Sequence, residues 1–152
     1  MGGQPRAGDA HKAVEPRMTE GPLLVLHVED DAAVRASVAA LLKTEGHAVH
    51  SVVDGESAVE LVQRQCLQPD VLIIDFNLPG DMDGAETAEA ICGAVGHSIP
   101  MLLLTGELTQ AGLPWLPGVP LFCASKPMDP DLLLRVVESF AALGRFARRH
   151  RE

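Results

Sequence analysis

The feature that most constrains the fold is a repeated pair of segments, in which a short apolar run is followed by a stretch whose apolar residues recur at helical spacing. A nearly continuous apolar run of this kind is typical of a strand that is covered on both faces. Because parallel strands need crossover connections, the alternation predicts an α/β fold, with a parallel sheet and helices on both of its faces. We predict five strands, at residues 23–28, 48–53, 71–74, 101–104 and 121–124.

Helical spacing follows the first, second, third and fifth predicted strands. The first helix has an apolar side between Val34 and Leu42 and starts after a run of acids, where Asp31 is interpreted as its cap. The last helix begins at Asp129-Pro130, a capping residue followed by the residue that is favoured at the first helical position. We predict that this helix ends near Arg148.

The segment after the fourth predicted strand differs from the others because it contains Pro114, Pro117 and Pro120. Each proline removes a backbone donor and opposes a helix that runs through its position. We therefore predict that the fourth helix is short or distorted.

Length and composition indicate a single folded domain. The chain has 152 residues, of which 47% are hydrophobic and 22% are charged, and both values lie in the globular range. The first residues mix Gly, Pro, Gln and charges without an apolar period, so nothing offsets the entropy of ordering them. We predict a flexible tail or linker at 1–21, the domain at 22–149 and a short tail at 150–152.

Charge and hydropathy limit the classes of partner. Twelve Lys and Arg against 21 Asp and Glu give a net charge of −9, which argues against capture of nucleic acid or an anionic membrane by the whole surface, although a local basic patch is left open. No apolar run approaches the roughly 20 residues of a membrane-spanning helix. No secretion signal is evident either. We expect a soluble, cytoplasmic protein that binds neither nucleic acid nor membranes.

The cysteines and histidines do not form a recognisable site in the sequence. Cys66, Cys92 and Cys123 are odd in number and lack C-x-x-C spacing, so we predict reduced thiols and neither a disulfide framework nor a zinc site. The six histidines are scattered along the chain, and we assign none of them chemistry.

Polar residues stand at the carboxyl ends of the predicted strands. Glu29 and Asp30 end the first strand, and Asp75 ends the third. Thr105 ends the fourth strand and Lys126 follows the fifth. Function gathers at the carboxyl ends of strands in parallel sheets of this kind, so we expect these five side chains to share one edge.

The motifs that contain these residues are Val-Glu-Asp-Asp, Ile-Ile-Asp-Phe-Asn-Leu-Pro-Gly, Leu-Leu-Thr-Gly and Ser-Lys-Pro. Together they resemble the receiver domain of the response regulators of two-component systems. The resemblance covers about Pro22 to Arg148. It implies a flavodoxin-like receiver fold, in which the five strands have the order 2-1-3-4-5.

The resemblance also assigns roles to the polar residues. Asp75 is implied to accept a phosphoryl group from a sensor histidine kinase or a hybrid-kinase transmitter domain, with Thr105 and Lys126 contacting the phosphoryl oxygens. The protein is then no enzyme with a separate substrate, but a signalling phosphoacceptor that catalyses its own phosphotransfer and dephosphorylation. The implied ligands of the Mg²⁺ cofactor are Glu29 and Asp30, directly or through water, together with Asp75 and the carbonyl of Asn77.

The chemistry of the residues supports these roles. Three carboxylates in one pocket repel each other unless a hard divalent cation lies among them, and oxygen ligands suit Mg²⁺. Phosphoryl transfer spreads charge over three oxygens, which a metal, a hydroxyl and a lysine can neutralise around one carboxylate nucleophile. An acyl phosphate adds charge and acceptors, so we expect the output to be a conformational change that controls a partner.

Two other functions are weighed against this one. The first is a receiver-like protein-interaction module that no longer turns over phosphate; the intact acidic pocket argues against it. The second is an aspartyl-phosphate hydrolase, which needs a second aspartate two positions after Asp75, where Asn77 stands instead. Dinucleotide and P-loop sites are excluded because no glycine motif of either type follows the first strand.

Three departures from the usual receiver sequence indicate a subgroup. Cys123 stands where many receivers have an aromatic residue, and Gly106 stands where alanine is usual. Gly80 makes the interval from Asp75 to Gly84 nine residues, one longer than the commonest pattern. Leu-Pro-Gly, Leu-Thr-Gly and a proline-marked region before a Phe-containing fifth strand resemble the receiver domains at the C-terminus of hybrid histidine kinases. The fourth helix, fifth strand and fifth helix form the usual partner face of the family, and a homodimer through this face is left open.

Overall fold

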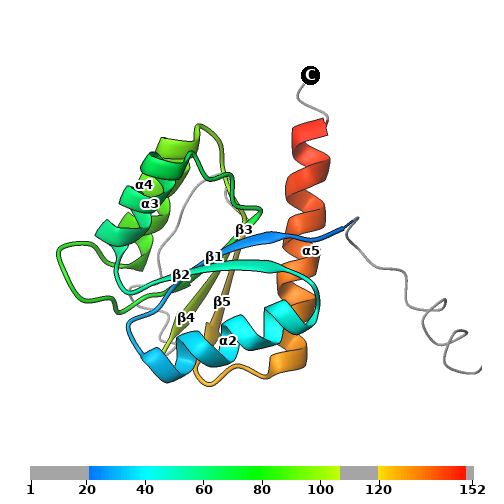
Figure 1. The fold of residues 1–152 in the computed structure, drawn as a ribbon, viewed down its shortest axis with the longest axis horizontal. Coiled ribbons are helices and arrows are strands. Elements are labelled where there is room, and N and C mark those ends of the chain that lie inside the picture. Colours follow the sequence, from blue (N-terminus) through cyan, green and yellow to red (C-terminus); the bar gives the residue numbers. More distant parts are fainter. Residues whose placement is uncertain (1–20, 107–119, 150–152) are drawn as a thin grey trace, which may run out of the picture.

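The computed structural model of the chain describes residues 21–106 and 120–149. Its five strands form one sheet in which every neighbouring pair is parallel, in the order β2-β1-β3-β4-β5 (Figure 1). The predicted parallel sheet and the 2-1-3-4-5 order are therefore confirmed. The strands are β1 (Leu24–Val28), β2 (Ala48–Val52), β3 (Val71–Asp75), β4 (Met101–Thr105) and β5 (Leu121–Ser125).

The helices of the described residues cover both faces of the sheet (Figure 1), as predicted. Side chains of α2 and α5 join one hydrophobic core, and side chains of α3 and α4 join the other. The fourth helix that the sequence predicts falls within residues 107–119 and lies outside the described residues. The helices are α2 (Ala32–Thr44), α3 (Gly55–Gln65), α4 (Gly84–Val95) and α5 (Pro130–Arg149).

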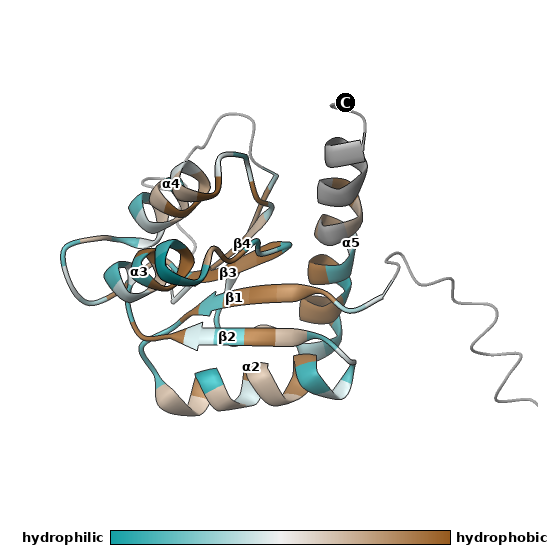
Figure 2. Cartoon of the chain, turned by 45° about the horizontal axis from the view of Figure 1, so that its top comes forward, coloured by the Kyte–Doolittle hydropathy of each residue, from teal (hydrophilic) through white to brown (hydrophobic). Residues whose placement is uncertain are grey.

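Strand β3 shows why two cores form. All of its residues are buried, and alternate side chains of a strand point to opposite faces. Leu72 and Ile74 lie in the core under α3 and α4, whereas Val71 and Ile73 lie in the core under α2 and α5. Figure 2 shows this strand as hydrophobic between helices that also carry hydrophilic residues. A strand that is buried on both faces thus requires the uninterrupted apolar run that the sequence contains.

The strand continues one residue further than the sequence predicts. Asp75 still pairs with Leu104 of β4, so β3 ends on a carboxylate at the edge of the sheet. Pairing with β4 therefore fixes the backbone of Asp75 and the position from which its side chain extends.

Aspartates fix the start of three helices. Asp31, Asp54 and Asp83 accept hydrogen bonds from backbone N–H groups in the first turns of α2, α3 and α4, respectively. Asp31 accepts two such bonds, of 2.8 and 3.1 Å, and the prediction that it caps the first helix is confirmed. A cap of this kind stabilises a protein by about 1 kcal/mol.

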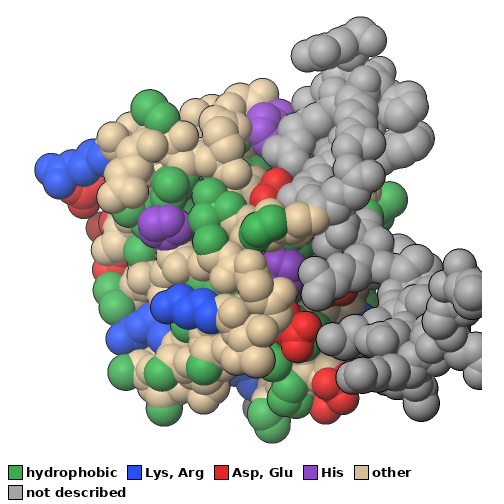
Figure 3. Space-filling view, turned by 45° about the vertical axis from the view of Figure 1, so that its right-hand side comes forward, with side chains coloured by type: hydrophobic (Ala, Val, Ile, Leu, Met, Phe, Trp, Pro, Cys, Tyr) green, Lys and Arg blue, Asp and Glu red, His purple; other side chains and the backbone are tan. Residues whose placement is uncertain are grey.

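The surface has mixed character in the described part of the chain. Figure 3 shows a face on which hydrophobic, acidic, basic and histidine side chains are interspersed. Among the helices of the described residues, none is long and apolar enough to cross a membrane.

Candidate functional site

The carboxyl end of β1 brings Glu29 and Asp30 to the candidate site. The N–H of Glu29 donates to the carbonyl of Val52 at 2.9 Å, which extends the pairing of β1 with β2 by one residue. Arg35 of α2 donates from Nη1 to the carbonyl oxygens of Glu29 and Asp30, both at 2.8 Å. The Glu29 residue is only 1% exposed, whereas Asp30 is exposed. Two successive acids in one anchored turn thus lie in different environments.

Asp75 is the buried carboxylate at the end of the neighbouring strand. Its Oδ1 accepts a hydrogen bond from the N–H of Asn77 at 3.1 Å, and its Oδ2 accepts one from Lys126 Nζ at 2.9 Å. Gly84 at the start of α4 lets the helix approach closely, because an added Cβ would lie 2.7 Å from the carbonyl oxygen of Asp75. Close packing therefore restricts the backbone of Asp75, and two hydrogen bonds restrict its side chain.

Lys126 joins the two buried acids. Its Nζ lies 2.7 and 2.9 Å from the two carboxylate oxygens of Glu29, in addition to its contact with Asp75. Its backbone N–H donates to the carbonyl of Thr105 at 2.8 Å, which holds the residue beside the end of β4. The peptide bond from Lys126 to Pro127 is cis. One ammonium group thus lies between two carboxylates that would otherwise repel each other.

The structure places the remaining predicted residues at the same edge. Thr105 is the buried last residue of β4, next to the position that pairs with Asp75. Asn77 is exposed in the loop that follows β3. The five side chains that were expected to share one edge therefore do so, and Asn77 lies in the adjoining loop.

Burial changes the protonation equilibria at this edge. Burial raises the pKa of the Glu29 carboxyl to about 7, and nearby Asp75 adds to the rise, whereas the hydrogen bonds from Lys126 oppose it. Burial disfavours the charged form of Lys126, but its hydrogen bonds to Glu29 and Asp75 outweigh burial and raise its pKa. The lysine is therefore a firmly held cation, and Glu29 binds a proton more readily than an exposed glutamate does.

The three acids have the arrangement that a divalent cation requires. One carboxylate oxygen from each of Glu29, Asp30 and Asp75 lies within 4.8 Å of the other two. Asp30 and Asn77 also line an open hollow of about 580 Å³, which gives water and ions access to the cluster. Hard oxygen ligands with room for retained water suit Mg²⁺. The donor set therefore fits the implied cofactor.

Two residues that contact the site were not singled out from the sequence. Arg35 anchors the turn of Glu29 and Asp30, and Glu56 of α3 contacts the loop after β3. The position of Arg35 one turn into the helix that follows the acids was an available signal, because a guanidinium there can reach back to their carbonyls. Glu56 gave no such signal, because its contact depends on how α3 packs beside α4.

His27 lies in β1, two residues before Glu29, and is 1% exposed. Its Nδ1 has no hydrogen-bond partner among the described residues. Burial, followed by the positive charges of Lys126 and Arg35, lowers the pKa of His27 to about 4. The side chain is therefore an uncharged packing group near neutral pH.

Comparisons with known proteins agree with this geometry. The chain is 37% identical over 83 residues to the response regulator MprA of Mycobacterium leprae, a match that covers 55% of this chain and 35% of that protein. The chain thus spans about a third of the length of that relative.

Among solved structures, the N-terminal domain of a response regulator/sensory box/GGDEF protein from Carboxydothermus hydrogenoformans has a TM-score of 0.70 at 29% identity, covering 84% of this chain and 99% of that chain. The receiver domain of the hybrid histidine kinase CckA has a TM-score of 0.65 at 28% identity, with 78% and 98% covered. The family model of the response regulator receiver domain matches residues 25–138. The chain therefore belongs to the response regulator receiver domain family.

Proposed function

We propose that this receiver domain takes a phosphoryl group onto Asp75 with the help of Mg²⁺, and that a histidine kinase or a hybrid-kinase transmitter domain supplies the group. The observation that carries the proposal is the contact of Lys126 Nζ with Asp75 Oδ2 at 2.9 Å, inside a cluster with Glu29 and Asp30. A nucleophilic carboxylate, a fixed cation and two further acids are the parts that metal-assisted phosphoryl transfer needs.

The reaction starts with attack of an Asp75 carboxylate oxygen on phosphorus. The bond from phosphorus to the leaving group of the donor breaks, the leaving group takes the electron pair, and an acyl phosphate forms on Asp75. Lys126 and the Thr105 hydroxyl stabilise charge on the phosphoryl oxygens. Glu29, Asp30, Asp75 and the Asn77 carbonyl would hold Mg²⁺, which would supply further neutralisation of that charge.

Phosphorylation then changes the balance of charge around Lys126. In the unmodified protein the ammonium group contacts two carboxylates. The acyl phosphate carries about 1.5 to 2 negative charges where the carboxylate carried one, so this position gains up to about one negative charge, together with three strong acceptors. The lysine is drawn toward the new oxygens, and we propose that the resulting rearrangement of the edge controls the binding of a partner.

Intact-mass measurement tests the proposal. The protein is incubated with a small phosphodonor such as acetyl phosphate, with Mg²⁺ or with a chelator, and Asp75→Asn is treated in parallel. We expect a phosphoryl adduct on the parent chain only, and only with Mg²⁺. An adduct that forms without the metal, or one that survives the substitution, contradicts the assignment. A folded parent chain that gains no adduct supports the interaction module.

A further inference from the structure

The loop between β3 and α4 is the part of the site edge that departs in length from the usual receiver pattern. It carries Asn77, and with Asp30 and Glu86 it lines the open hollow next to the acid cluster. Gly80, within this loop, has a φ of +93°, a backbone conformation that favours glycine. Hydrogen bonds hold the two ends of the loop: the Asn77 N–H donates to Asp75 Oδ1, and the Gly84 N–H donates to the carbonyl of Phe76.

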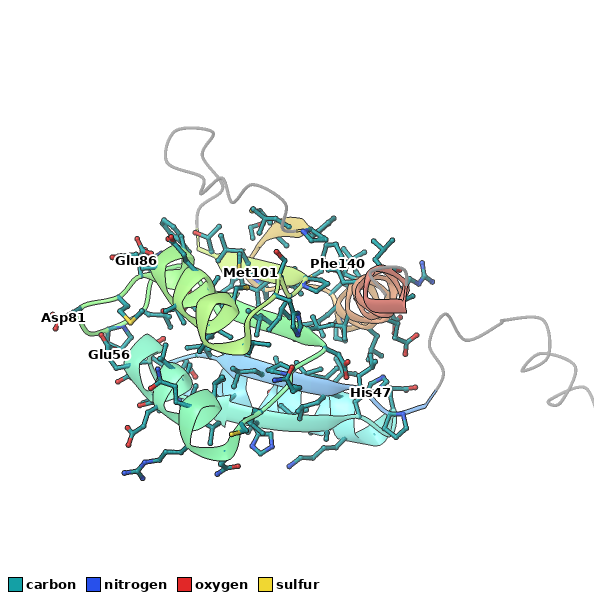
Figure 4. All side chains as sticks on the ribbon, turned by 90° about the horizontal axis from the view of Figure 1, so that it is seen from above. His47, Glu56, Asp81, Glu86, Met101 and Phe140 are labelled. Atoms are coloured by element: carbon teal, nitrogen blue, oxygen red, sulfur yellow. The ribbon has the colours of Figure 1, made fainter. Side chains whose placement is uncertain are left out.

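Glu56 of the neighbouring helix α3 provides a further contact to this loop. Its Oε1 accepts a hydrogen bond from the N–H of Asp81 at 2.9 Å. Its Oε2 lies against the same turn, because a Cβ added at Gly80 would be only 2.8 Å from it. Figure 4 shows Glu56 and Asp81 at the same end of the molecule. Because Glu56 and Asp81 have like charges, the backbone hydrogen bond and not an ion pair holds them together.

The start of α3 is a firm support for this carboxylate. The cap Asp54 accepts a hydrogen bond from the N–H of Ser57 at 2.8 Å, which fixes the first turn of the helix. Gly55 packs so closely against α4 that an added Cβ would collide with Thr87 Oγ1. Gly84 of α4 in turn packs against the carbonyl of Asp75. A continuous series of contacts thus connects Glu56 with the end of β3.

We infer that Glu56 is a positioning residue, which clamps the lengthened loop at Gly80 and Asp81 and so keeps Asn77 and the hollow in the geometry that binds the divalent cation. The inference rests on the proposed function, in which Asn77 supplies a metal ligand. Glu56 touches none of the three acids of the cation cluster, Glu29, Asp30 and Asp75, in any contact of the described residues, so its effect passes through the loop backbone.

Three variants distinguish the positioning role of Glu56 from a simple effect of its charge. Glu56→Ala removes the acceptor and the charge, whereas Glu56→Gln removes the charge and keeps an acceptor for the Asp81 N–H. Glu60→Ala is the matched control, because Glu60 is exposed on the same helix and pairs only with Arg64 at the surface among the contacts described. Two quantities are measured on the full chain: hydrogen exchange of the Asp81 amide without metal, and the dissociation constant for Mg²⁺ by calorimetry.

We expect Glu56→Ala to accelerate exchange at Asp81 and to raise the Mg²⁺ dissociation constant by about 3- to 10-fold, as loss of one hydrogen bond implies. Glu56→Gln should keep most of the protection of the Asp81 amide and most of the Mg²⁺ affinity of the parent chain. Glu60→Ala should match the parent chain in both quantities. The positioning role of Glu56 is wrong if Glu56→Ala and Glu60→Ala change the Mg²⁺ dissociation constant equally, or if Glu56→Gln binds Mg²⁺ as weakly as Glu56→Ala. It is also wrong if Glu56→Ala changes exchange at Asp81 but leaves the Mg²⁺ dissociation constant unchanged.

Exchange at Asp81 and the Mg²⁺ dissociation constant also distinguish a failure of the positioning role from a failure of the proposed function. If the parent chain binds no Mg²⁺, the proposed function fails whatever the exchange at Asp81 shows, and the positioning role fails with it. If the parent chain binds Mg²⁺ and is phosphorylated but Glu56→Ala binds Mg²⁺ as Glu60→Ala does, only the positioning role of Glu56 fails. Thermal unfolding without metal shows whether each variant is folded.

Discussion

The two sides of the candidate site hold their acids in different ways. Glu29 and Asp75 are buried, lie at the ends of adjacent strands and contact one lysine directly. Asp81, in the loop after β3, is exposed and is held through its backbone N–H. The buried side is therefore sensitive to charge, and the loop side is sensitive to backbone conformation.

The buried side should depend most on Lys126. We expect Lys126→Met to lower the free energy of unfolding without Mg²⁺ by about 3 kcal/mol, because loss of one partner leaves buried carboxylates uncompensated. Mg²⁺ should restore part of this loss, since it supplies positive charge at the same place. Urea unfolding with a chelator and with Mg²⁺ measures both effects. Lys43→Met, at an exposed position of α2, is the control, and an equal loss in the two variants would contradict the prediction.

Glu29 should give the buried side a dependence on pH. Its pKa of about 7 in the folded protein lies above the ordinary value of 4.5. The folded state thus binds the proton more tightly, so the stability that Glu29 contributes is complete below pH 4.5 and is lost as the pH rises through 7. Without Mg²⁺, we expect a loss on the order of 2 to 3 kcal/mol over this range that Glu29→Gln lacks.

Urea unfolding at several pH values in a chelator measures this difference between Glu29→Gln and the parent chain. Asp30→Asn removes a carboxylate from the exposed neighbouring position and should keep the pH dependence of the parent chain. If Glu29→Gln loses the same stability as the parent chain between pH 4.5 and 7, then Glu29 is not the group that titrates.

The loop side should respond to backbone strain. Gly80→Ala and Gly46→Ala both place a side chain at positive φ, of +93° and +88°, but only an added Cβ at Gly80 meets Glu56. We expect each substitution to cost about 1 kcal/mol for the conformation, and Gly80→Ala to cost about 0.5 to 1 kcal/mol more for the contact. In the Glu56→Ala background this excess should disappear. Denaturant unfolding of Gly46→Ala, Gly80→Ala, Glu56→Ala and the double variant at Gly80 and Glu56 measures these differences. If the additional cost of Gly80→Ala remains in the double variant, contact with Glu56 is not its cause.

The smallest change in stability concerns two adjacent acids, Asp30 and Asp31, to which we assign different roles. Asp31→Ala should lower stability by about 1 kcal/mol, because it removes the cap of α2, and should leave Mg²⁺ affinity near that of the parent chain. Asp30→Ala should weaken Mg²⁺ binding and change stability little, because Asp30 is exposed and belongs to the oxygen cluster. Calorimetry with Mg²⁺ and thermal unfolding give both quantities. The opposite pattern would exchange the roles of these two residues.

Much of the fold followed from local patterns. The apolar runs predicted each strand within one residue at either end. The inner strands β3 and β4 are buried throughout and therefore need such a run, whereas the outer strands β2 and β5 are half-buried or exposed. The prediction for β3 missed Asp75, since a polar residue looks like the end of a strand although its backbone still pairs with β4. Cys123 is partly buried in β5, and burial raises the pKa of its thiol, but the sequence alone showed only that no aromatic residue stands there.

Local sequence patterns were sufficient to predict the alternation of strands and helices, the residues at the carboxyl ends of the strands and the cap of the first helix. These features depend on residues close together in the chain and on the period of each element. Tertiary packing brings Lys126 to both Glu29 and Asp75, Arg35 to the turn of Glu29 and Asp30, and Glu56 to the loop after β3. Such contacts join distant segments, and their strength depends on the burial that packing creates.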